Sequence, residues 1–213
     1  MIKINTLITG PLGVNTYIVH DDSSNKSIII DPAEGLRIKN YLDDNNLVCT
    51  HILLTHGHFD HILGVAYLKR ETGAKVLIHE ADASALSSDK VSLAAFTGSS
   101  IEKCEADTLL HDGDELNLSG IDIRVMHTPG HSKGSVCYIV ESSRVIFSGD
   151  TLFRLSVGRS DLYRSNEADL QFSLLYKLYA LKGDYEVFPG HERRTELEFE
   201  RQHNPYTKHL IYE

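Results

Sequence analysis

Hydrophobic residues in the first 31 positions fall into three short runs separated by polar or turn-forming residues. The runs are IKINTLIT, NTYIVH and SIIID, and the breaks are Gly10-Pro11 and the polar cluster from Asp21 to Lys26. Short apolar or alternating runs with such boundaries are typical of β-strands. The beginning of the chain therefore predicts a meander of strands.

The pattern then changes to alternating helices and strands. AEGLRIKNYLDDNN has apolar residues at helical spacing, HILLT is a short apolar strand, HILGVAYLKRETG is a helix closed by Gly73, and AKVLIH is another strand. A strand, a helix and a strand at this spacing predict a parallel pair with a right-handed crossover. Residues 81–107 have a mixed pattern that predicts only a short helical piece.

The second half of the chain returns to strands and ends in helices. DELNLSG and IDIRVMHTPG predict a hairpin around Ser119-Gly120, and GSVCYIVESSRVIFSGD predicts two strands around Ser142-Ser143. NEADLQFSLLYKLYALKGD is an amphipathic helix, YEVFPGH is a final strand, and TELEFERQHNPY is a last helix that stops before Pro205. The order predicts one α/β domain over residues 1–213, with two similar halves, sheets inside and helices outside.

The composition is that of an ordinary globular chain. With 213 residues, of which 41% are hydrophobic and 24% charged, the chain can bury one substantial core. The net charge of −9 argues against nucleic acid or an anionic membrane as the main partner. We see no secretory signal and no bilayer-spanning apolar run, and the three cysteines form no CxxC pair, which indicates inert thiols in a reducing compartment. We therefore expect a cytoplasmic protein.

The stretch THGHFDH places three histidines and an aspartate directly after an apolar run. His56 and His58 are two positions apart and leave the same face of an extended backbone. Asp60 and His61 begin the next helix, where Asp60 is a good N-cap. These groups converge at the carboxyl end of a buried strand, where α/β proteins commonly bind ligands. A polar helix start with coincidental histidines is the alternative interpretation.

Three more residues able to bind metal follow apolar strands. His131 follows the Pro-Gly turn of MHTPGHS, and His191 ends YEVFPGH. Asp150 follows the strand VIFSG, where Gly149 allows a close approach of backbones. Imidazole and carboxylate ligands suit zinc, manganese or iron, and the lack of cysteine ligands argues against a purely structural zinc site. Seven ligands are too many for one tetrahedral ion but suffice for two, which Asp150 could bridge.

The motifs THGHFDH, HTPGHS, SGDTLF and FPGH match in order and spacing those of the metallo-β-lactamase superfamily, and within it the chain resembles the glyoxalase II-like hydrolases. The resemblance covers essentially the whole chain and implies an αββα sandwich of two mixed sheets flanked by helices. It also implies two metal sites that share a bridging carboxylate: His56, His58 and His131 for the first, Asp60, His61 and His191 for the second, and Asp150 as the bridge.

The same resemblance implies a reaction. Two divalent ions, for which zinc is expected and iron or manganese are alternatives, would hold a bridging hydroxide that attacks an acyl carbon, and Asp60 would orient it. The implied substrate is a small-molecule thioester such as S-D-lactoylglutathione. The alternatives are a persulfide dioxygenase with one iron ion, or another metallo-hydrolase such as a lactonase or a phosphodiesterase. Gly190 favours the hydrolase, because persulfide dioxygenases generally have alanine there.

Two differences from full-length glyoxalase II enzymes concern the substrate. Those enzymes hold glutathione with a C-terminal helical region, whereas only 22 residues (213 − 191) follow His191 here. Glu192-Arg193-Arg194 also stands where related sequences have Gly-Pro. We therefore expect weak saturation by glutathione thioesters. Four arginines in the motif loops are candidates for binding a substrate carboxylate: Arg154, Arg159, Arg193 and Arg194.

The remaining polar candidates have structural interpretations. Asp31 of IIIDP either supports a metal ligand from behind or simply forms the turn before Pro32. Six histidines are expected to lack convergent partners and to have structural roles: His20, His51, His79, His111, His203 and His209. His127 lies nearest the site, only four residues before His131, and a structural hydrogen bond is favoured there over metal ligation.

Overall fold

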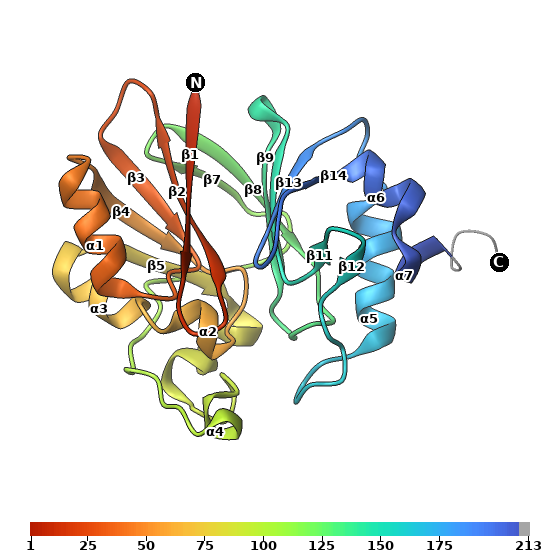
Figure 1. The fold of residues 1–213 in the computed structure, drawn as a ribbon, viewed down its shortest axis with the longest axis horizontal. Helices are drawn as coiled ribbons and strands as arrows, with labels where there is room; N and C mark the ends of the chain where they lie inside the picture. Colours follow the sequence, from red (N-terminus) through yellow and green to blue (C-terminus); the bar gives the residue numbers. More distant parts are fainter. Residues whose placement is uncertain (209–213) are drawn as a thin grey trace.

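The computed structural model describes residues 1–208, in which two six-stranded β-sheets face each other between two layers of helices (Figure 1). His209, one of the seven histidines with a predicted structural role, lies outside the described residues. Within residues 1–208, no helix has the length and hydropathy that crossing a membrane requires.

The strands of the first sheet follow one another in chain order: β1 (Ile2–Thr9), β2 (Val14–Asp21), β3 (Lys26–Ile30), β4 (Val48–Leu53), β5 (Lys75–His79) and β6 (Thr108–Leu110). The first three are antiparallel neighbours, as the predicted meander requires, whereas β3 to β6 run parallel. Helices α1 (Gly35–Asp44) and α3 (Val65–Thr72) cover the outer face of this sheet. Because β4 lies between two parallel strands and is covered on both faces, much of its sequence is apolar.

The second sheet has the strand order β14 (Thr195–Glu196), β13 (Glu186–Pro189), β10 (Val145–Gly149), β9 (Val136–Val140), β8 (Ile121–His127) and β7 (Glu115–Leu118). Both predicted antiparallel pairs, β7 with β8 and β9 with β10, are present. The prediction that YEVFPGH is the final strand was wrong, since β14 pairs with β13 after it. A strand of two residues is too short to produce a pattern. The small hairpin of β11 (Leu152–Phe153) and β12 (Ser156–Val157) lies apart from both sheets.

Helices of the second half flank this second sheet: α5 (Glu167–Phe172), which continues as the π-helical η3 (Ser173–Leu178), α6 (Leu197–His203) and α7 (Pro205–Lys208). The last predicted helix stops before Pro205, as expected, but proline then begins α7, because the first position of a helix needs no backbone N–H donor. Two short helices fill the segment that was hardest to predict: the 3₁₀ helix η1 (Glu80–Ser87) and α4 (Ala94–Thr97). Another short 3₁₀ helix, η2 (Glu141–Ser143), joins β9 to β10.

The single helix predicted over residues 61–73 is two helices, α2 (Phe59–Ile62) and α3, with a break at Gly64. The Gly64 N–H donates to the Pro32 carbonyl at 2.8 Å, outside the helix. A side chain at Gly64 would place its Cβ 2.6 Å from the Gly35 nitrogen. The helix is therefore interrupted where the loop between β3 and α1 packs directly against its backbone.

Apolar side chains form a central cluster between the sheets and one cluster between each sheet and its helices. In the central cluster the Tyr17 ring of the first sheet lies 5.2 Å from the Phe147 ring of the second. The buried Tyr138 hydroxyl donates to the Leu54 carbonyl at 2.7 Å, which joins the second sheet to the chain just after β4. This packing confirms the predicted αββα sandwich and holds the ends of strands from both sheets together.

Candidate metal centre

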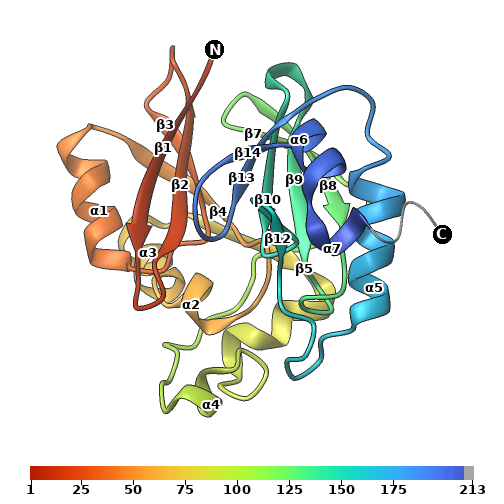
Figure 2. The ribbon, with the colours of Figure 1, turned by 45° about the vertical axis from the view of Figure 1, so that its right-hand side comes forward.

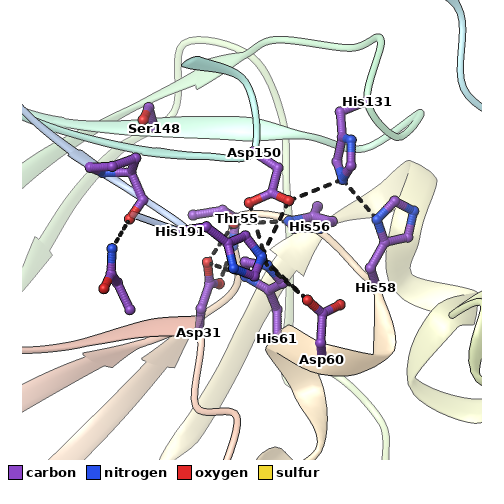
Figure 3. A network of polar contacts seen from close by, with 12 residues as sticks. Asp31, Thr55, His56, His58, Asp60, His61, His131, Ser148, Asp150 and His191 are labelled. Atoms are coloured by element: carbon purple, nitrogen blue, oxygen red, sulfur yellow. Dashed lines mark hydrogen bonds and ion pairs between the residues drawn. The ribbon is translucent and has the colours of Figure 1, made fainter. Parts of the chain in front are cut away.

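Seven side chains from both sheets meet at the edge where several strands end (Figure 3). They come from the loops after β4, β8, β10 and β13 and from the short helix α2: His56, His58, Asp60, His61, His131, Asp150 and His191. All are buried except His191, whose side chain is 21% exposed. The structure thus brings together every residue that the sequence motifs single out.

His56, His58 and His131 form the first triad, in which one ligand atom from each ring lies within 4.8 Å of the others. The His58 Nδ1 and His131 Nε2 atoms are 2.9 Å apart. The His131 Nδ1 donates to the Arg159 carbonyl at 2.8 Å, which turns the lone pair of Nε2 toward His58. The buried His56 Nε2 has no hydrogen-bond partner among the described residues. Such inward-facing, unpaired nitrogens are suited to a cation.

Asp60, His61 and His191 form the second triad. The His191 Nε2 lies 3.3 Å from both the Asp60 Oδ2 and the His61 Nε2. The prediction that Asp60 is an N-cap was wrong, because α2 begins at Phe59 and His58 occupies the cap position. From the first turn of the helix, the Asp60 carboxylate points at the two histidines instead.

Asp150 lies between the two triads (Figure 3). Its Oδ1 is 3.4 Å from the His61 Nε2, and its Oδ2 is 3.4 Å from the His131 Nε2. The Asp150 Oδ1 is buried without a hydrogen-bond partner in the described part of the chain. The preceding Gly149 has φ of 49°, and a Cβ there would lie 2.4 Å from the Thr55 Oγ1. The absence of a side chain at Gly149 therefore lets the loops after β4 and β10 come together, as the sequence predicted.

Asp31 supports this centre from behind. Its carboxylate accepts hydrogen bonds from the Thr55 N–H at 2.8 Å and the Thr55 hydroxyl at 2.6 Å, and its Oδ2 lies 2.9 Å from the His61 Nδ1. A carboxylate at Nδ1 fixes the ring so that Nε2 faces Asp150 and Asp60. Of the two interpretations of Asp31, the geometry favours the support of a metal-site histidine.

The two triads differ in their electrostatics. Burial lowers the pKa of His56 and His58 well below the usual value, and neighbouring histidines lower it further, so both rings are neutral at pH 7. Burial also lowers the pKa of His61, but the carboxylates of Asp150, Asp60 and Asp31 outweigh it and raise the pKa to about 10. Burial raises the pKa of Asp60, yet His61 and His191 outweigh it and hold the carboxyl ionised. One triad thus offers free lone pairs, and the other offers negative charge that a divalent cation would neutralise in place of a proton.

Asp82 supports the first triad, although its sequence context did not indicate this role. It lies in η1 and is 3% exposed. Its carboxylate accepts from the Gly57 N–H at 3.0 Å, the Ser132 hydroxyl at 2.6 Å and the Gly134 N–H at 3.0 Å. These donors belong to the loops that carry His56, His58 and His131. Asp82 therefore connects the two halves of the first triad, although in the sequence it is one polar residue in a mixed stretch.

Asp82→Asn is expected to weaken metal binding about 10- to 100-fold while preserving the fold, as loss of an indirect support commonly does. In the unaltered protein three donors bind the oxygens of the Asp82 carboxylate. The asparagine amide would turn an N–H toward at least one of these donors, so at least one connection between the loops is lost. Competition with a chromogenic chelator measures the affinity, and circular dichroism monitors the fold. Glu80→Gln, at an exposed position of the same helix, serves as the control. An affinity equal to that of the unaltered protein would show that the loops hold their positions without Asp82.

The other histidines among residues 1–208 lie outside the centre. His79 was expected to lack a convergent partner, but its ring stacks on that of His127 at 3.9 Å. The pair forms because β5 and β8, on different sheets, end side by side, which a linear sequence does not reveal. Each also makes the predicted kind of structural bond, from the Ala81 N–H to the His79 Nδ1 and from the His127 Nε2 to the Lys133 carbonyl.

The four candidate arginines do not share one location. Arg159 lines the cavity beside the triads, where it makes two bonds to Asp161 at 2.9 and 3.0 Å. Arg154, Arg193 and Arg194 line a different cavity of about 860 Å³. Of the four candidates for binding a substrate carboxylate, Arg159 therefore lies beside the metal centre and the other three line the separate cavity.

Two facing mixed sheets between helices, with histidines and aspartates gathered at their shared edge, define an α/β sandwich protein with a metal centre. A model of the metallo-beta-lactamase superfamily matches residues 9–191, and the chain belongs to that superfamily. The histidine and aspartate cluster, together with this membership, indicates divalent metal ions as cofactors.

Two relatives give the similarity a functional context. The probable metallo-hydrolase YqgX of Bacillus subtilis is 32% identical over 206 residues, which cover 96% of this chain and 97% of YqgX. A hydroxyacylglutathione hydrolase of Pelagibacter ubique is 30% identical over 177 residues, which cover 83% of this chain and 66% of that protein.

Three solved structures are similar over nearly the whole chain. The B3 metallo-beta-lactamase BLEG-1 has a TM-score of 0.91 at 33% identity, with 97% of this chain and 99% of that chain covered. TTHA1623 in a di-iron-bound form has a TM-score of 0.84 at 34% identity, covering 95% and 99%. ETHE1 from Myxococcus xanthus has a TM-score of 0.81 at 26% identity, covering 98% and 89%.

Proposed function

We propose that this protein is a hydrolase that cleaves a thioester such as S-D-lactoylglutathione at a centre of two divalent ions. The observation that carries the proposal is the pair of triads with Asp150 between them, within 3.4 Å of a histidine nitrogen of each triad. The relative described as a hydroxyacylglutathione hydrolase supports a thioester as the substrate class.

In this proposal His56, His58 and His131 would hold the first ion and Asp60, His61 and His191 would hold the second. Asp150, which lies between the two triads, would contribute to both. Zinc is the metal we propose, because borderline imidazole and hard carboxylate ligands in open sites suit it. TTHA1623, whose structure is of a di-iron-bound form, makes iron the first alternative to test.

Bound divalent ions supply a hydroxide nucleophile at neutral pH and polarise the carbonyl oxygen. The chain's own residues position that chemistry. Asp60, which stays ionised, offers a carboxylate oxygen that orients the attacking oxygen atom by accepting its proton in a hydrogen bond. Asp31 and the Arg159 carbonyl hold His61 and His131 in fixed orientations, so the site is arranged before the substrate arrives.

A persulfide dioxygenase with one iron ion is the second candidate, and the similarity to ETHE1 is the observation in its favour. A mononuclear site needs only one set of ligands. Here a second complete triad lies beside the first, which supports the dinuclear hydrolase.

Side-by-side assays on metal-analysed protein test the proposal. We expect two equivalents of zinc per chain, hydrolysis of S-D-lactoylglutathione with weak saturation, and no sulfite from glutathione persulfide and oxygen. Protein stripped of metal by a chelator, and the same protein after zinc is restored, are the controls. One equivalent of iron together with sulfite formation, and no thioester cleavage, would replace the hydrolase by the dioxygenase.

A further inference from the structure

A cavity of about 560 Å³ opens beside the metal centre, and five of the seven metal-centre residues line it. Its remaining walls are mainly apolar and aromatic: Leu12, Phe59, Leu93, Phe96, Phe153 and Tyr163. Its volume falls within the range of small-molecule sites, which are typically apolar with a few polar groups at the reacting end. The metal centre would be the polar end of this cavity.

Several of these apolar side chains are exposed to water although they are large. Phe96 is 65% exposed, Leu12 is 58% exposed and Tyr163 is 44% exposed. They come from three separate segments: the turn between β1 and β2, helix α4, and the loop between β12 and α5. Figures 1 and 2 show α4 projecting beyond α2, away from both sheets. Exposed apolar groups that gather from distant segments around one cavity indicate a binding surface.

The backbone of this wall is also strained. Leu93 has φ of 69°, a left-handed conformation that a bulky residue rarely adopts, and its side chain lines the cavity. The Leu93 N–H donates to the Lys90 carbonyl, and the Phe59 N–H donates to the Ser92 carbonyl at 2.7 Å. Strain of this kind persists where surrounding contacts enforce it, and it is common at ligand sites.

The charges of the cavity disfavour an anionic substituent. Among the described residues, Arg159 is the one cationic side chain that lines it, and Asp161 already neutralises that guanidinium through two bonds. Asp161 also lines the cavity, and Lys90 lies outside the lining, 5.1 Å from the Tyr163 ring. A carboxylate placed against the apolar walls, away from the metal centre, would lose water without gaining a free cation.

We infer that this cavity binds an uncharged, apolar acyl group, with the carbonyl carbon of the substrate at the metal centre. The inference rests on the proposed thioester hydrolysis and names the part of the substrate that the chain recognises. It places recognition on the acyl side of the substrate.

A series of zinc-activated assays tests this with N-acetylcysteamine thioesters, whose thiol portion is uncharged. The series from acetyl to hexanoyl adds four methylenes to the acyl group. Each methylene raises kcat/KM about fourfold when it is fully buried (~0.8 kcal/mol). Because the rim of the cavity is exposed, we expect kcat/KM to rise about 10- to 100-fold across the series. Glutathione thioesters of the same acids should show the same dependence on acyl length.

Phe96→Ala should reduce kcat/KM for the hexanoyl thioester about 5- to 10-fold more than it reduces kcat/KM for the acetyl thioester, since a short acyl group does not reach the rim. Phe96 is exposed, so the variant should fold. Phe172→Ala removes another exposed phenylalanine, 54% exposed on α5 and outside the cavity, and should change neither substrate.

Titration calorimetry separates this inference from the proposed function. Alkyl hydroxamates from acetyl to hexanoyl bind to zinc without being hydrolysed, so the change in their affinity along the series reports the cavity. Hydroxamate affinity that rises with chain length and falls in Phe96→Ala supports the acyl site, even if no thioester is cleaved. In that case the proposed reaction is wrong and the acyl site stands. Thioester cleavage with no dependence on acyl length, together with hydroxamates of equal affinity, would overturn the acyl site and leave the hydrolase in place.

Discussion

Asp150→Asn should lower kcat/KM by at least about 100-fold and reduce the metal content, while the protein stays folded. Asp150 contacts a histidine of each triad, and an amide supplies one oxygen and no negative charge where two charged oxygens face histidine nitrogens. The side chain keeps its size, and its Oδ1 has no hydrogen-bond partner among the described residues, so the fold loses little. Elemental analysis, turnover and thermal unfolding measured on one preparation provide the three readouts.

Asp43→Asn is the matched control, because Asp43 lies on α1 with a side chain 61% exposed and pairs only with Lys39 among the described residues. It should keep full metal content and activity. If Asp150→Asn behaved in the same way as this control, Asp150 would not be the bridge between two ions.

Gly190→Ala should lower the metal content by about one equivalent per chain and lower kcat/KM roughly 100-fold, as Asp150→Asn does. The cause is steric displacement alone. A Cβ at this position would lie 2.2 Å from the Asp150 Oδ1 and 2.8 Å from the His61 Cε1. The backbone cannot easily move away, because the Gly190 N–H donates to the Gly149 carbonyl and the Gly190 carbonyl accepts from the Asn15 N–H, both at 2.8 Å. The added methyl group must therefore push the Asp150 carboxylate out of its position between the triads.

Gly73→Ala distinguishes this effect from a general cost of replacing glycine. Gly73 ends α3 with φ of 70°, and no atom lies within 4 Å of a Cβ built there. That variant should lose about 1–2 kcal/mol of stability because alanine is strained in the left-handed region, and it should keep both metal ions. Gly190→Ala with full metal content and activity would mean that the Asp150 carboxylate has another position from which it binds both ions.

The fold could be predicted largely because each strand and helix carries its own pattern. The β7–β8 and β9–β10 pairs join neighbouring runs across short turns, so local residues are enough to predict them. The break at Gly64 could not be predicted in the same way. It depends on the loop around Pro32 and Gly35, which is distant in sequence and approaches only when the first sheet is formed.

Asp82 and the walls of the cavity also depend on tertiary contacts that local residue patterns do not predict. Asp82 has no sequence signal, because its three donors belong to loops near positions 57 and 134. Phe96 and Tyr163 are ordinary aromatic residues in the sequence, and they become parts of one wall, with rings 6.1 Å apart, only after the two halves of the sandwich close.

The sequence by itself determined which residues could bind metal and at which strand ends they would lie. Buried strands need apolar runs, and a polar group just beyond such a run can be recognised in the sequence. Only the tertiary structure decided that His191 would lie 3.3 Å from Asp60, that Asp150 would reach both triads, and that an apolar cavity would open beside them. The distances from His191 to Asp60 and from Asp150 to His61 join residues of opposite sheets. They are set by the packing of the two sheets around their common core, a long-range property that local residue patterns do not encode.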